Sequence, residues 1–158
     1  MSGEQHIDKA VTKLRSYINA NIATKLRAVE TAQSLTTNSL TDPVAVLDHR
    51  APFDNRSPLI EVFEESWRFV DQRQGLVSVD ATIAVKYITD ADISAAENFM
   101  RRYMSAVIET IRADSTLGNT VVDCLLTDGS SAVGRGDTST TLLVSTQGVD
   151  VHVFEGVN

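Results

Sequence analysis

The sequence predicts a single α+β domain in which two long amphipathic helices pack on one face of a mostly antiparallel sheet. Two segments repeat apolar residues at spacings of three and four, as helices do, and several others alternate apolar and polar residues, as strands do. The chain has 158 residues, 42% of them hydrophobic and 22% charged, which is typical of one globular domain. We therefore expect residues 1–158 to form one domain.

The first predicted element is a helix that runs from near Ile7 to Ala32. Its apolar residues form one stripe, which a sheet or another chain must cover. The members of this stripe are Ile7, Val11, Leu14, Ile18, Ile22, Leu26 and Val29.

The helical pattern ends at Gln33, and residues 33–58 are predicted to form an extended arm. Turn-forming residues precede Pro43, and further prolines at Pro52 and Pro58 keep the backbone extended. Residues 44–47 fit either a short strand or a packed loop. A connection of this length is usually functional or becomes ordered on a partner.

Two strands and a second helix follow the arm. The strand from Leu59 to Phe69 has its large apolar residues at odd positions, and Gln72 to Gly75 form the turn into a strand from Leu76 to Ile88. This second strand alternates most cleanly, so one of its faces should be buried. The helix should begin at a cap formed by Thr89 or Asp90 and end before Gly118.

The chain should close with strands at residues 119–127, 138–146 and 149–154. The small residues at 128–137 predict a mobile loop between the first two of these strands. Gln147 and Gly148 predict a tight hairpin between the last two, because glycine readily adopts a positive φ.

Composition limits the class of function. The 14 Lys and Arg residues against 21 Asp and Glu residues give a net charge of -7, which opposes binding to nucleic-acid phosphates. An acidic surface is compatible with DNA that slides past without adhering. The first residues lack the features of a signal peptide and no apolar stretch is long enough to cross a bilayer, so we expect no membrane partner. The single Cys124 excludes an intrachain disulfide and fits assembly in a reducing cytoplasm.

No catalytic, cofactor-binding or metal-binding residues are predicted. The glycines at 129–136 lack the Lys-Ser/Thr pair and the following helix of a phosphate-binding loop. Asp48, His49 and Asp54 have irregular spacing and no second His or Cys, so a polar loop explains them better than a metal does. The carboxylates of Glu61, Glu64 and Glu65 lie in one strand, where a solvated face is the simpler interpretation. Neither His6 nor His152 has an identifiable partner in the sequence.

Two stretches point to a family. They are Thr41-Asp42-Pro43-Val44-Ala45-Val46 and Pro52-Phe53-Asp54-Asn55-Arg56-Ser57-Pro58-Leu59-Ile60-Glu61-Val62-Phe63, followed by the long strand to Ile88 and the helix after Asp90. This order of elements resembles that of bacteriophage tail terminator proteins, also called tail-completion or head–tail joining (neck) proteins. The likeness covers most of the chain at the level of pattern.

The resemblance implies a structural virion protein without enzymatic activity or cofactor. Its copies, typically six, would form a ring that caps the tail tube protein and docks onto the head connector or stopper, and DNA would pass through the lumen without specific binding. The protein would be assembled in the host cytoplasm and reside at the head–tail junction. On this interpretation the contacts to other subunits and partners lie in the arm and in the 128–137 loop, and the expected contact residues are Arg50, Phe53, Asp54, Arg56, Arg135 and Asp137.

Three alternatives stay open. The first helix is longer than the family pattern leads us to expect, which leaves a neighbouring neck or head-completion protein as the first alternative. A small enzyme with a carboxylate or nucleotide site is a second alternative. A regulatory or chaperone protein that binds a helix in a sheet-lined groove is the third.

Overall fold

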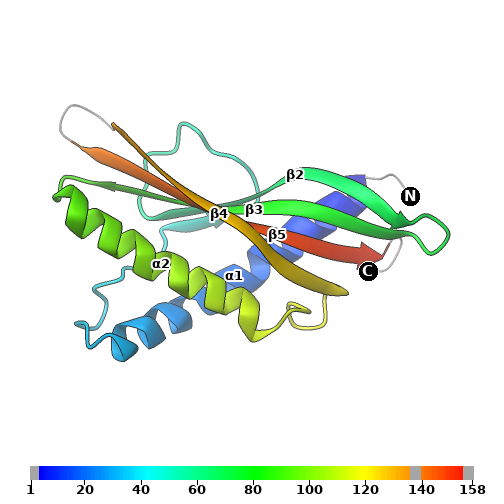
Figure 1. Cartoon of the computed structure of the whole chain (residues 1–158), viewed down its shortest axis with the longest axis horizontal. Coiled ribbons are helices and arrows are strands. Elements are labelled where there is room, and N and C mark those ends of the chain that lie inside the picture. The colour runs from blue at the N-terminus through cyan, green and yellow to red at the C-terminus, as the bar shows by residue number, and fades with distance from the viewer. Residues whose placement is uncertain (1–3, 136–139, 155–158) are drawn as a thin grey trace.

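A computed structural model describes residues 4–135 and 140–154, which form two helices and a five-stranded sheet. The elements, in chain order, are α1 (Glu4–Ala32), β1 (Ala45–Leu47), β2 (Leu59–Asp71), β3 (Leu76–Thr89), α2 (Ile93–Ala113), β4 (Asp123–Arg135) and β5 (Thr141–Phe154). The strands lie in the order β1-β2-β3-β5-β4 (Figure 1), with β1 parallel to β2 and all other neighbours antiparallel. The predicted α+β fold is thereby confirmed.

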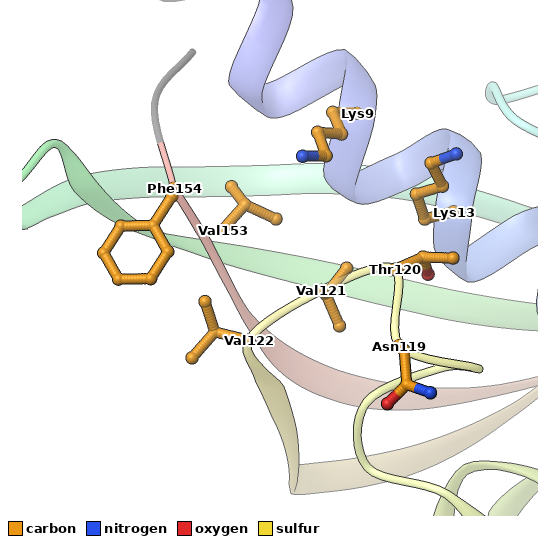
Figure 2. A pocket seen from close by; sticks show the side chains of 8 residues that line it. All are labelled: Lys9, Lys13, Asn119, Thr120, Val121, Val122, Val153 and Phe154. Carbon is orange, nitrogen blue, oxygen red and sulfur yellow. The ribbon is translucent and has the colours of Figure 1, made fainter. Parts of the chain in front are cut away.

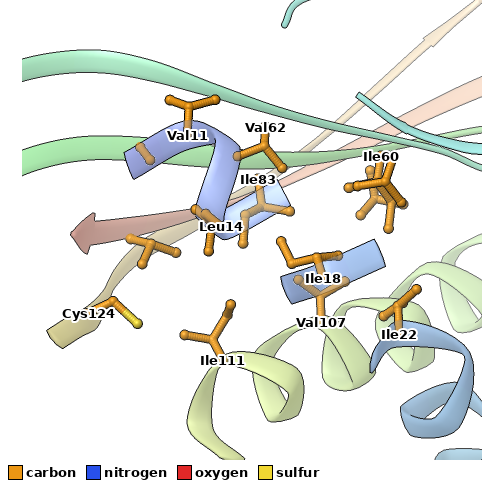
Figure 3. Packing of buried hydrophobic residues seen from close by; sticks show 14 of the residues in the cluster. Val11, Leu14, Ile18, Ile22, Ile60, Val62, Ile83, Val107, Ile111 and Cys124 are labelled. Carbon is orange, nitrogen blue, oxygen red and sulfur yellow. The ribbon is translucent and has the colours of Figure 1, made fainter. Parts of the chain in front are cut away.

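Both helices pack against one face of the sheet and share one core with it. The apolar stripe of α1 lies between strand residues such as Val62 and Ile83 and the α2 residues Val107 and Ile111 (Figure 3). From β3 the core takes the residues at odd positions from Val77 to Val85, as the alternation predicts. The burial of these side chains drives the association of the helices with the sheet.

The structure differs from the prediction in β2, where the alternation changes phase. The register with β3 shifts between Glu64 and Ser66, which marks a β-bulge. Before the bulge, Ile60 and Val62 face the core, while Phe63 faces away from the helices opposite Thr82. After the bulge, Trp67 lies opposite the core residue Val79 and therefore shares its face. The large odd-numbered residues of this strand thus lie on two faces rather than one.

The prediction of a mobile loop at 128–137 is wrong for residues 128–135, because β4 continues through them and pairs with β5. Small side chains do not prevent strand pairing, since the hydrogen bonds between paired strands come from the backbone. Two hydroxyl contacts support the pairing: Ser130 to Thr146 at 2.8 Å and Ser131 to Ser145 at 2.9 Å. Residues 136 and 137 lie outside the described part of the chain.

The predicted hairpin at Gln147-Gly148 is also wrong, because β5 is one continuous strand. Gly148 lies where the β4 register shifts between Leu126 and Gly129, and a Cβ there would collide with Thr127 Oγ1. The Gln147 side chain donates from Nε2 to the Thr127 carbonyl at 2.9 Å. The glycine therefore allows the close approach of two backbones at a bulge, not a turn.

The arm at 33–58 is only partly extended. Its first turns are held by the buried carboxylate of Glu30, which accepts hydrogen bonds from the backbone N–H groups of Asn38 at 3.1 Å and Leu40 at 2.8 Å. β1 then adds to the edge of β2, which resolves the ambiguity at 44–47. Residues 48–58 form a loop on the face of the sheet opposite to α2 (Figure 1). We call this segment the 48–58 loop.

The second helix starts later than predicted. Its N-cap is Asp92, whose carboxylate accepts hydrogen bonds from the backbone N–H groups of Ser94 and Ala95. Thr89 ends β3 instead, and Gly118 adopts a φ of 72° in the turns that follow the helix.

Candidate contact surfaces

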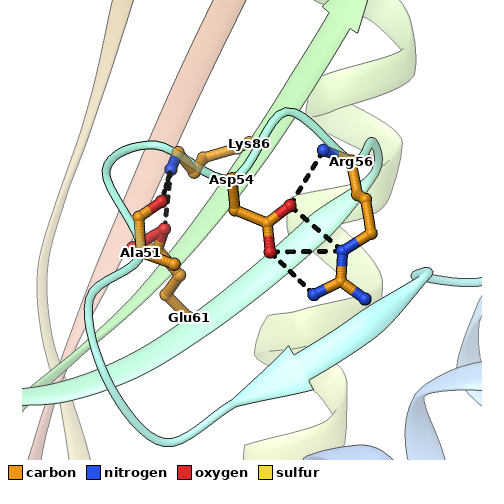
Figure 4. Close-up of polar contacts among 5 residues, drawn as sticks. All are labelled: Ala51, Asp54, Arg56, Glu61 and Lys86. Atoms are coloured by element: carbon orange, nitrogen blue, oxygen red, sulfur yellow. Dashed lines mark hydrogen bonds and ion pairs between the residues drawn. The ribbon is translucent and has the colours of Figure 1, made fainter.

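The 48–58 loop is clamped by an ion pair between Asp54 and Arg56 (Figure 4). Arg56 donates from Nη2 to Asp54 Oδ2 at 2.7 Å and from Nε to Oδ1 at 3.0 Å, and its backbone N–H also donates to Oδ1 at 3.0 Å. These hydrogen bonds from Arg56 lower the pKa of Asp54 from 3.8 to about 2. The clamp fixes a tight turn in an otherwise exposed loop.

A second contact holds the 48–58 loop on the sheet. Lys86 projects from β3 on the face away from the helices, and its Nζ donates to the Ala51 carbonyl at 2.8 Å and to Glu61 Oε1 at 2.7 Å (Figure 4). Both charged side chains are largely buried. At the end of the loop, the Ile88 N–H donates to Ser57 Oγ at 2.8 Å. The loop is therefore anchored at its middle and at its end.

Phe53 lies at the tip of this anchored loop, and 93% of its surface is exposed. A phenyl ring in water carries a large unfavourable hydration term, which burial against a partner would remove. Because the loop is already ordered, a partner that buries Phe53 loses little conformational entropy on binding. The sequence-based prediction of a contact at Phe53 is compatible with this exposure.

Arg50, another predicted contact residue, covers part of the β2 edge. Its guanidinium stacks over the Phe63 ring at 4.2 Å, and it contacts Glu65 Oε2 and the Glu64 carbonyl at 3.3 and 3.4 Å. Arg50 thus satisfies one carbonyl of the strand edge just beyond β1.

The end of the 48–58 loop lies at the same end of the sheet as the end of β4, whereas Arg50 contacts the middle of β2. Ser57, near the end of the 48–58 loop, is hydrogen-bonded to Ile88 of β3. Ile88 pairs with Leu142 of β5, and Leu142 pairs with Gly134 of β4, the residue before Arg135. Two strand spacings amount to roughly 10 Å. Backbone pairing therefore brings the loop and Arg135 to neighbouring positions, while Asp137 lies outside the described residues.

β4 is the outermost strand of the sheet, and within the described residues no strand pairs with its outer side. Every residue from Thr127 to Gly134 is exposed, and no charged residue lies between Asp128 and Arg135. Leu125 and Val133 expose 56% and 55% of their surfaces. A long uncharged edge with apolar side chains is a template for pairing with another chain.

A polar cluster on the outer face of the sheet has no signature in the sequence. His152 of β5 contacts Asp123 Oδ1 through Nδ1 at 2.5 Å and Asp150 Oδ2 through Nε2 at 3.5 Å. Ser78 of β3 donates to the other carboxylate oxygen of Asp150. The contact between Asp123 and His152 spans 29 positions in sequence, so only strand pairing could have revealed it. It ties the edge strand β4 to β5.

A hollow of about 280 Å³ lies between α1, the segment before β4 and the end of β5. Figure 2 shows Lys9 and Lys13 of α1 above the residues from Asn119 to Val122. Its walls combine two lysine side chains with valines and Phe154. The described lining residues include no His, Cys, Asp or Glu side chain.

Four of the five carboxylates considered from the sequence contact a basic side chain in the structure. Glu61 is buried against Lys86, and Glu65 contacts Arg50. Asp54 is held by Arg56, while Asp48 contacts its neighbour His49 at 3.1 Å. The described residues contain no group of three or more His, Cys, Asp or Glu side chains placed to hold a metal ion. Burial raises the pKa of the Cys124 thiol to about 11, which disfavours the reactive thiolate.

Neither α1 nor α2, within residues 4–135 and 140–154, combines the length and apolar content required to span a membrane. No protein-family model matches the chain, and no curated protein sequence matches it. The assignment of function therefore depends on the surfaces described above.

Proposed function

We propose that this protein is a structural virion protein of a bacteriophage, a tail terminator whose copies form a hexameric ring between the tail tube and the head connector. The unpaired outer edge of β4 is the observation that carries this proposal. A stable monomeric protein usually protects such an edge with charges, proline or a covering element. The uncharged residues from Gly129 to Gly134 are all exposed, so a second chain can complete the sheet.

Other features support the same role. The 48–58 loop presents Phe53 on a rigid base, which suits a permanent contact to the tail tube or the connector. The net charge of -7 allows DNA to pass a ring of such subunits without adhering. Assembly, rather than catalysis, is the activity that these surfaces favour.

The first test is the size of the purified protein. We expect rings in negative-stain images and a hexamer mass in sedimentation and light-scattering measurements. Val133→Lys places a charge on the β4 edge and should leave a folded monomer, as judged by circular dichroism. Ile93→Lys, which adds the same charge at an exposed apolar residue of α2, is the matched control and should form rings.

Location within the particle is the second readout. Antibodies against the protein should label the head–tail junction of the phage that encodes it. A wild-type protein that stays monomeric at high concentration, or Val133→Lys rings identical to wild type, would contradict the proposal.

A further inference from the structure

We propose that the β4 edge of one copy pairs with the free edge of β2 in the next copy, so that the sheet continues around the ring. The inference rests on the proposed function, because it names the acceptor for the edge that the ring must use. The occupant of the β2 edge is a second copy of this chain.

The β2 edge is open where such a pairing needs it. β1 pairs only with Leu59 to Glu61, and the Arg50 side chain donates a hydrogen bond to the Glu64 carbonyl. From Ser66 to Asp71 no strand of the described chain lies on the outer side of β2. Along this stretch Trp67, Phe69 and Val70 are all exposed, with 54% of the Trp67 surface in contact with solvent.

A groove of about 440 Å³ adjoins this edge. Its apolar walls are Ile7 and Val11 of α1 together with Phe63 and Trp67 of β2. A strand added along residues 66–71 would meet this groove at Trp67, and its backbone would satisfy the open N–H and C=O groups of β2. The groove and the open edge therefore adjoin at Trp67.

The directions of the two edge strands allow a ring to close. β2 is antiparallel to β3, β3 to β5 and β5 to β4, so β2 and β4 run in opposite directions within one subunit. A second copy in the same orientation therefore presents its β2 antiparallel to β4 of the first. Such a head-to-tail contact uses two different patches and generates a ring when its rotation closes.

Side-chain size and the faces of the strands select a register. Directly opposed residues of an antiparallel pair share a face, and both Val133 and Trp67 are on the helix-bearing face. Placing Val133 opposite Trp67 sets Ser131 opposite Phe69 and Gly134 opposite Ser66. The small residues of β4 then lie against the large residues of β2.

The same register places residues of opposite charge opposite or near each other at both ends of the contact between β4 and β2. It brings the exposed Asp128 to the turn that carries the exposed Arg73, while Arg135 takes the position opposite Glu65. A shift by two residues keeps the faces but moves Arg135 away from the position opposite Glu65. The register is thus a specific and testable part of the inference.

The test is disulfide trapping with Ser66→Cys and Gly134→Cys in one chain. Neither change removes a large side chain, and the Cβ of a residue at 134 would meet no atom within 4 Å. Mild oxidation of the full-length protein should give covalent hexamers on non-reducing gels, because paired Cα atoms lie within disulfide range. The pair Arg68→Cys and Gly134→Cys, shifted by two residues on the same face, is the matched control and should give monomers.

Charge reversal provides a second measurement. Asp128→Arg and Arg73→Asp should each raise the concentration required for half-assembly severalfold, and the double variant should restore the wild-type value. Rings without trapping at Ser66 and Gly134 would overturn the proposed interface, and efficient trapping by the shifted pair would overturn the register. Absence of rings in the wild-type protein would instead contradict the proposed function itself.

Discussion

The ion pair between Asp54 and Arg56 determines how the 48–58 loop responds to acid. Hydrogen bonds from Arg56 hold the Asp54 pKa near 2, well below its ordinary value of 3.8. A carboxyl group whose pKa is lowered by folding contributes stability above its unfolded pKa and loses this contribution as the pH falls through the folded value. The clamp should therefore persist through mildly acidic conditions and open between about pH 4 and pH 2.

Replacement of Arg56 by Gln should raise the pKa of Asp54 from about 2 toward 3.8, because the carboxylate loses its charged donor. Carboxyl carbon shifts in an NMR pH titration measure this change directly. Arg50→Gln is the matched control, since Arg50 is equally exposed but contacts Glu65 instead. An Asp54 pKa that responds equally to both substitutions would refute the clamp.

At the scale of the elements, the bulges decide which residues the strands present. The shift after Glu64 turns Trp67 and Phe69 toward the helix-bearing face at the free end of β2. The shift between Leu126 and Gly129 draws Thr127 against Gly148 of β5. Each bulge is local, but it changes the face of every later residue in its strand.

We expect Gly148→Ala to destabilise the protein, because the new methyl group would overlap Thr127 Oγ1. Combination with Thr127→Ala should recover part of the loss, although the Asp128 carbonyl remains within 3.2 Å of the new Cβ. Chemical denaturation followed by circular dichroism gives the stability of the single and double variants. Full additivity of the two changes would argue against this close approach.

At the scale of the whole molecule, one core joins both helices to the sheet. Leu14 of α1 is completely buried within it, close to residues of β2, β3 and α2 (Figure 3). Loss of packing at this position should therefore affect the entire fold cooperatively, since none of the elements within residues 4–135 and 140–154 has a separate core.

Leu14→Ala should lower the free energy of unfolding by about 2–5 kcal/mol in a single transition. We suggest measuring it by urea denaturation in the Val133→Lys background, so that assembly does not add to the apparent stability. The control is Ile93→Ala at an exposed position of α2, which should change stability by less than about 1 kcal/mol. Separate transitions for helix and sheet signals would contradict the single core.

The proposed ring came from the family resemblance, whereas the fold class was predicted from local patterns. The stripe of α1 and the alternation of β3 are readable because a helix and a strand impose their periods on neighbouring residues. The length of the arm likewise indicated a segment for contacts, and Arg50, Phe53 and Arg56 within it stay predicted contact residues. These features depend on short stretches of chain.

Pairing between distant segments could not be read in this way. Gly148 looked like a turn residue until β4 was placed beside it, and residues 128–135 looked like a loop until β5 supplied the ladder. The two partners of Lys86, and the Asp123 partner of His152, lie 25 to 35 positions away in sequence. The sequence by itself determined the class of the fold and the amphipathic faces, because local periodicity encodes them. Only the tertiary structure decided which strand edges remain open, because an edge is defined by the neighbour it lacks.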